Sequence, residues 1–146
     1  MNPNFIGQYT HSIDSKGRVI VPVKFKNALG DKFYLSIGLD GCLYIFPQDR
    51  WEAFSEQLNK LPWSNPRARE LQRRIFSSST DCEVDNQGRI LINQYLREKA
   101  GLVKDVVFSG DGHRIEVWSK ERYDSREDLG SLEELAGEFD DFGIAP

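Results

Sequence analysis

One short pattern occurs twice in this chain and constrains its fold more than any other feature. The copies are Asp14-Ser15-Lys16-Gly17-Arg18 and Asp85-Asn86-Gln87-Gly88-Arg89, and an apolar run follows each of them. They are 71 residues apart (85 − 14), and the same offset aligns Gly30 with Gly101. Similarity at one fixed offset indicates an internal duplication.

Each copy predicts a tight turn between two strands. Asp is favoured at the first position of such a turn because its carboxylate accepts a backbone N–H two residues later. Gly is favoured at the fourth position, where a positive φ is required. We therefore interpret four residues as turn-forming: Asp14, Gly17, Asp85 and Gly88. Each Asp could also form an ion pair that orients the following Arg, and the pattern alone allows both roles.

The same order of elements is predicted in each half: strand, turn, strand, short helix and hairpin. The expected strands cover residues 5–13, 18–21, 33–37, 43–45, 82–85, 89–92, 106–108 and 115–117, and the expected short helices cover 22–29 and 94–100. Asp40-Gly41 and Asp111-Gly112 are typical hairpin turns. A unit of about 40 residues buries too little surface to fold alone, so we expect the two halves to interleave into one body.

Helical sequence follows each half. Asp49 with Glu52 predicts a capping box, and Asn65-Pro66 predicts an N-cap and first helical position. The helix after Asn65 is expected to run to about Ser77, with Ala68, Leu71 and Ile75 on its apolar face. Its other face is basic and could be solvated, contact a neighbouring subunit or contact nucleic acid; it carries Arg67, Arg69, Arg73 and Arg74.

The charge is unevenly distributed. Residues 124–146 hold eight acidic residues and one basic residue, so residues 1–123 carry +3 of the total −4. A mildly basic body is compatible with nucleic acid, and the acidic tail could dock on a partner, lie across the basic face or remain a disordered solubilising segment. The tail also contains a capping pattern, Ser131 with Glu134.

Several classes of protein are disfavoured. No stretch approaches the roughly 20 apolar residues of a membrane helix, and we expect no secretory signal and a cytoplasmic location. Cys42 and Cys82 are isolated and are expected to be free thiols. The two His residues form no metal-spaced set, and no nucleophile elbow or phosphate loop is present. We therefore expect no enzyme activity, no metal, no cofactor and no small-molecule ligand.

At this level of detail the chain resembles the MraZ family. His11-Ser12-Ile13-Asp14-Ser15-Lys16-Gly17-Arg18 is similar to its first signature, and Cys82-Glu83-Val84-Asp85-Asn86-Gln87-Gly88-Arg89 is similar to its second. The spacer 65–69 and the closing segment 115–123 also resemble the family, so the match covers roughly residues 5–123.

The resemblance implies a mainly β fold with short helices (α+β), in which two tandem AbrB-like repeats form a swapped-hairpin β-barrel with flanking helices. The implied boundaries are 5–51 for module 1, 52–78 for a helical linker, 79–123 for module 2 and 124–146 for the tail.

The resemblance also implies a function. It predicts a bacterial transcriptional regulator that represses its own division and cell-wall gene cluster. Such a protein binds short direct repeats in double-stranded promoter DNA as a ring-shaped homo-oligomer at the nucleoid. The implied DNA-binding residues are Arg18 and Arg89, with Lys16 beside them, Lys24, Lys26 and Arg97 on the short helices, and His11 on the lead-in strand. The alternative is a non-catalytic protein-interaction module of the same fold.

Overall fold

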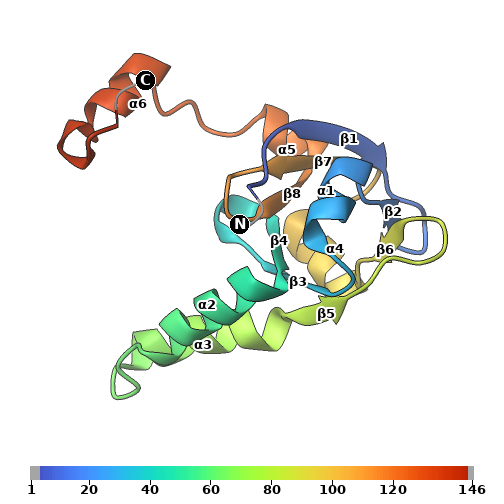
Figure 1. Cartoon of the computed structure of the whole chain (residues 1–146), viewed down its shortest axis with the longest axis horizontal. Coiled ribbons are helices and arrows are strands. Elements are labelled where there is room, and N and C mark those ends of the chain that lie inside the picture. Colours follow the sequence, from blue (N-terminus) through green and yellow to red (C-terminus); the bar gives the residue numbers. More distant parts are fainter. Residues whose placement is uncertain (1–3, 145–146) are drawn as a thin grey trace.

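A computed structural model describes residues 4–144 and shows a mixed α+β chain (Figure 1). The strands are β1 (Gln8–Ser12), β2 (Arg18–Ile20), β3 (Phe33–Ile37), β4 (Leu43–Pro47), β5 (Thr80–Cys82), β6 (Arg89–Leu91), β7 (Asp105–Gly110) and β8 (Ile115–Ser119). The helices are α1 (Val23–Leu29), α2 (Gln48–Asn59), α3 (Pro66–Ser78), α4 (Gln94–Ala100), α5 (Lys120–Asp124) and α6 (Leu132–Gly137). Two 3₁₀ turns, η1 (Leu39–Gly41) and η2 (Asp140–Phe142), complete the order.

The strands form two antiparallel sheets. One has six strands in the order β1-β7-β8-β4-β3-β5, and the other is a two-stranded ribbon of β2 and β6. Pairings of β1 with β7, β2 with β6, β3 with β5 and β4 with β8 each join one half of the chain to the other. Only β3–β4 and β7–β8 join strands of the same half among the described residues.

The Asp-Gly turns and the turns of the repeated pattern therefore differ in whether the strands on either side of them pair with each other. The hairpins at Asp40-Gly41 and Asp111-Gly112 are confirmed, because β3 pairs with β4 and β7 pairs with β8. A type I turn followed by Gly is a common hairpin loop, so the repeated pattern also predicted a hairpin between the strands that flank Asp14. That pairing was wrong. Asp14 N–H does bond the Arg18 carbonyl at 2.9 Å, but β1 then diverges to β7 while β2 turns to β6. Each half has too few strands to cover its own apolar side chains. Strands of one half therefore pair with strands of the other, and the apolar side chains of both are buried together.

Both faces of the large sheet are buried, which gives the molecule two apolar clusters. Alternate residues such as Leu43 and Ile45 of β4 enter the main core, together with Phe25 of α1 and Leu96 of α4. The residues between them enter a smaller aromatic cluster on the opposite face. That cluster contains Tyr44, Phe46, Val107 and Trp118, covered by Trp51 and Phe54 of α2 and Tyr123 of α5.

Helices α2 and α3 form a hairpin that projects from the body (Figure 1). Asn65 caps α3 as predicted, with its side chain accepting the N–H groups of Arg67 and Ala68, and Pro66 follows at the first helical position. The capping box at Asp49 was wrong. Helix α2 begins one residue earlier, at Gln48, and Glu52 instead accepts a bond from the Gln48 side chain at 3.3 Å. The apolar face predicted for α3 also needs correction, because Leu71 is 44% exposed.

The resemblance predicted a closed barrel, and within residues 4–144 the six-stranded sheet ends at β1 and β5 without closing. The mixed α+β class is what the structure shows, and the swapped-hairpin barrel stays a prediction. Within the same residues, no helix is long and apolar enough to cross a membrane.

Candidate nucleic-acid interface

The β2–β6 ribbon brings the two copies of the repeated pattern together. In its antiparallel register, Arg18 lies opposite Leu91 and Ile20 lies opposite Arg89. The central pair is Val19 with Ile90, and each of these side chains is 1% exposed. Because side chains alternate between the faces of a strand, the ribbon has one core face and one outer face, and Arg18 and Arg89 share the outer face.

The ribbon is symmetric about its central pair. Val21 donates its N–H to the Gly88 carbonyl at 3.0 Å, and Ile92 donates its N–H to the Gly17 carbonyl at 2.8 Å. The two donors differ in position by 71 residues, and so do the two acceptors. Each turn is therefore fixed by a strand of the other half, which gives the pair of turns an approximate two-fold relation.

Each Asp holds both its own turn and the Arg that follows. Asp14 Oδ1 accepts the N–H groups of Lys16 at 3.0 Å and Arg18 at 2.9 Å, while Asp14 Oδ2 accepts Arg18 Nε at 2.9 Å. Asp85 makes the same three bonds to Gln87 and Arg89, at 2.8, 2.9 and 3.0 Å. One carboxylate thus serves in the turn and in the ion pair, so both roles left open by the sequence are present in the geometry.

These contacts keep each Asp ionised and hold the side chain of its Arg partner in one direction. The backbone N–H of Arg18, and then its guanidinium and the N–H of Lys16, lower the pKa of Asp14 below its ordinary value. Asp85 has a lowered pKa for the same reason, with the backbone N–H of Arg89 the largest cause. Both carboxylates therefore remain ionised at neutral pH. Each ion pair uses Nε, so the described contacts leave the terminal nitrogens of each guanidinium available to a ligand.

The two turns are not equivalent. Arg97 of α4 reaches over the first turn and donates to the carbonyls of Ile92 and Lys16. A Cβ built on Gly17 would lie 1.8 Å from Arg97 Nη1, whereas one built on Gly88 meets nothing within 4 Å. Arg97 corresponds to Lys26 at the 71-residue offset, so within residues 4–144 only the first turn is covered by a guanidinium group.

The other predicted residues lie around this ribbon with different exposure. Lys16, at the tip of the first turn, and Lys24, on α1, are exposed, while Lys26 is half-buried beside Glu83 and Val84 of the second half. His11 lies on β1, half-buried, with its ring packed edge-on against Phe108 at 6.2 Å between centroids.

The sequence reasoning missed two exposed apolar residues of the outer face, Ile20 at 44% and Leu91 at 61%. The signal was available, because residues two apart in a strand share a face and each follows its Arg by two. It also missed a third ion pair of the same kind as Asp14–Arg18 and Asp85–Arg89. In this pair, Asp111 Oδ2 accepts a hydrogen bond from Arg114 Nε at 2.9 Å. That guanidinium stacks over the Tyr44 ring at 4.6 Å and lies outside the ribbon.

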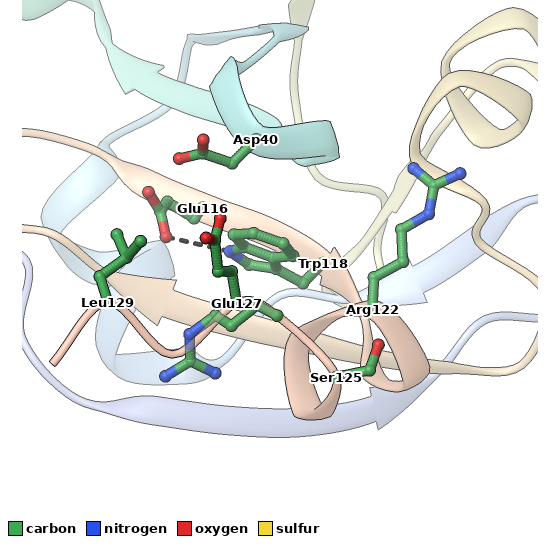
Figure 2. Close-up of a pocket in the computed structure, with 8 residues that line it drawn as sticks. Asp40, Glu116, Trp118, Arg122, Ser125, Glu127 and Leu129 are labelled. Carbon is green, nitrogen blue, oxygen red and sulfur yellow. Dashed lines mark hydrogen bonds between the residues drawn. The ribbon is translucent and has the colours of Figure 1, made fainter.

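A hollow beside β8 has the opposite electrostatic character. Figure 2 shows three carboxylates around it, those of Asp40, Glu116 and Glu127, with the Trp118 indole donating to Glu116 at 3.0 Å. Arg122 borders the hollow but donates to the backbone carbonyls of Gly41 and Lys99. Arg126 also borders the hollow and stacks over the Tyr123 ring at 4.0 Å. With three carboxylates against two guanidinium groups, the hollow is a poor site for phosphate, and this surface is separate from the candidate interface.

Comparison with known proteins agrees with the duplicated architecture. The model of the family described as "MraZ protein, putative antitoxin-like" matches residues 4–74 and again residues 75–135. A protein of Lachnoclostridium phytofermentans named "Transcriptional regulator MraZ" is 50% identical over 141 residues, which cover 97% of this chain and 99% of the relative. A protein of the same name from Caldanaerobacter subterraneus is 48% identical over 142 residues, covering 95% and 99%. With two repeats matched and relatives this similar over their full length, the chain belongs to the MraZ family.

Proposed function

We propose that this protein is a transcriptional regulator that binds double-stranded promoter DNA through the outer face of the β2–β6 ribbon. The observation that carries the proposal is the pair of equivalent arginines on that face, Arg18 and Arg89, each held by an ionised Asp at about the same distance. Relatives of this chain are named transcriptional regulators. Preorganised side chains lose less conformational entropy on binding, which favours recognition of a defined site.

The chemistry of the outer face suits DNA. The major groove admits a two-stranded β-ribbon, and Arg pairs bidentately with guanine O6 and N7 or with phosphate. Lys16 is placed to contact phosphate beside Arg18, and Lys24 extends the positive surface along α1. Arg97 acts mainly by supporting the first turn, since it already donates to two backbone carbonyls, whereas Lys26 adds positive charge on α1. We assign His11 the most peripheral role, because its ring packs on Phe108.

The proposed architecture is a swapped-hairpin body made of two AbrB-like modules, residues 5–51 and 79–123, joined by the helical linker 52–78. It is supported by the four strand pairings between halves and by the reciprocal bonds between the two turns. Neither module has a complete sheet of its own, so the modules fold together as a single DNA-binding unit.

The proposed regulation is repression of the gene cluster that contains the protein's own gene, at the nucleoid. Binding to short direct repeats requires several ribbons in one assembly, and a ring-shaped homo-oligomer supplies them. Each added ribbon raises avidity through effective concentration, without strengthening any single contact.

A mobility-shift assay tests the proposal against the alternative of a protein-interaction module. The probe is the region upstream of the protein's own gene, with a fragment of equal length and base composition from inside a gene as the control. At a stated, moderate salt concentration we expect retention of the upstream fragment alone, because phosphate contacts depend steeply on salt and base contacts supply the selectivity. Equal retention of both fragments, or of neither, would contradict the proposal.

A further inference from the structure

The chain ends in a segment whose apolar side chains find no cover in the described structure. This segment is residues 129–144 of the acidic tail (124–146), and it contains α6 and η2. Leu132 is 78% exposed, Phe142 is 76% exposed and Phe139 is 45% exposed. A six-residue helix is marginal in water without tertiary contacts, and α6 stands clear of the body (Figure 1). The tail therefore presents an amphipathic surface that lacks a partner.

The body next to the tail is the wrong partner. Carboxylates surround the apolar side chains of the tail; they belong to Glu133, Glu134, Glu138, Asp140 and Asp141. The hollow that the chain crosses as it enters the tail also carries carboxylates, on Asp40, Glu116 and Glu127 (Figure 2). Arg122 and Arg126 also border the hollow, but both donate to backbone carbonyls. Repulsion between the carboxylates of the hollow and those of the tail disfavours folding of the tail back onto that surface.

Helix α3 offers the complementary surface. Arg67, Leu71 and Arg74 are spaced i, i+4 and i+7, so they lie on one side of the helix, and all three are exposed. We call this side the arginine face. Trp63, in the turn before α3, is 78% exposed. Glu70 is the one acidic residue within α3, and it pairs with both Arg73 and Arg74. The face thus combines excess positive charge with exposed apolar groups.

We infer that the acidic tail of one copy of the chain docks on the arginine face of α3 in a second copy. This inference rests on the self-association in the proposed function and names the surfaces that make it. A contact between two different surfaces is head-to-tail, and such contacts generate closed rings when the rotation between neighbours permits. In Figure 1 both surfaces lie away from the β2–β6 ribbon, so docking leaves the candidate DNA interface free.

Two variants of the full chain test the two surfaces separately. The tail variant carries Leu132→Asp and Phe139→Asp, and the face variant carries Arg67→Glu and Arg74→Glu. Sedimentation velocity should show each variant with self-association weakened roughly tenfold or more, since loss of central interface side chains has effects of this size. The matched controls are Val103→Asp, at a side chain that is 84% exposed, and Lys60→Glu, at the residue directly after α2. Both should sediment like the parent. Thermal unfolding of every variant checks that it is folded.

Mixing the two variants decides whether the contact is between copies. The tail variant keeps an intact arginine face and the face variant keeps an intact tail, so an equimolar mixture should form a species of two chains. A mixture that stays at the mass of single chains, or single variants that sediment like the parent, would overturn the inference.

The proposed function fails in a different way. A parent protein that sediments as a single chain would remove the self-association itself, whatever the variants do. DNA retention by the same preparations reports on the ribbon, and Arg18→Ala with Arg89→Ala should lower that retention without changing the sedimentation of the protein.

Discussion

At the residue scale, the duplicated Asp carries the candidate interface. Asp14 and Asp85 each accept two turn N–H groups and one guanidinium Nε, so one side chain shapes the loop and directs the Arg. The sequence predicted the turn because Asp and Gly preferences are local. It could not choose between the two roles of the carboxylate, because that choice depends on where the Arg rotamer points.

The carboxyl groups give a prediction about pH. The pKa values of Asp14 and Asp85 are lowered in the folded chain, so the unfolded chain binds more protons at low pH and stability rises with pH in that range. The contribution is complete above the ordinary Asp pKa and is lost as the pH falls through the lowered value. Carboxyl ¹³C shifts in an NMR titration should place both midpoints below the ordinary Asp value. Midpoints at or above that ordinary value would contradict the ion pairs of Asp14 with Arg18 and of Asp85 with Arg89.

The two turn glycines should respond differently to alanine. Both have a positive φ, +87° for Gly17 and +77° for Gly88, so each substitution adds strain of about 1–2 kcal/mol to the folded state. In Gly17→Ala the new Cβ also meets the Ile92 carbonyl at 2.6 Å, whereas Gly88→Ala meets open space. Urea unfolding should show Gly17→Ala to be the more destabilised by roughly 1–3 kcal/mol. Equal losses would show that Arg97 and Ile92 do not enclose the first turn.

At the scale of elements, the sequence predicted most of the local features correctly, but it did not predict which distant strands pair. The hairpins β3–β4 and β7–β8 and the N-cap at Asn65 depend on neighbouring residues, and each is present. The pairing of β1 with β7 and of β3 with β5 joins strands from different halves of the chain. It depends on how the whole chain buries its apolar side chains, and the residue preferences of a turn do not predict it. The Asp49 capping box failed because Pro47 ends β4 and α2 begins directly after it.

The ribbon gives a prediction that separates its two faces. Ile90 is 1% exposed and Leu91 is 61% exposed, although they are adjacent in β6. Ile90→Ala should lower the free energy of unfolding by about 2–5 kcal/mol, because it leaves a cavity in the main core. Leu91→Ala should change it by no more than about 0.5 kcal/mol. Chemical denaturation of both variants checks the assignment, and a larger loss for Leu91→Ala would mean that the ribbon faces the other way.

At the scale of the whole molecule, the net negative charge lies in the tail and the net positive charge lies in the body. The net charge of −4 would argue against DNA if it were uniform, but residues 124–146 carry a net charge of −7 and residues 1–123 carry +3. In Figure 1 the ribbon lies on one side of the sheet, while the α2–α3 hairpin and the tail project from the other. The sequence predicted the unequal charge because it is compositional. It also predicted a basic face on α3, but it placed Leu71 on the apolar face by helical spacing, whereas Leu71 is 44% exposed beside Arg67 and Arg74.

The central claim is that Arg18 and Arg89 together bind promoter DNA, and equilibrium binding of the single and double Ala variants tests it most directly. The measurement uses the upstream fragment at one stated salt concentration, with Arg114→Ala as the control for loss of an Asp-held Arg outside the ribbon. Each single variant should lose about 1–3 kcal/mol of binding free energy, roughly fivefold to 150-fold in affinity, and the double variant should lose more. Folded Arg18→Ala and Arg89→Ala proteins that bind the fragment as tightly as the parent and Arg114→Ala would contradict the account.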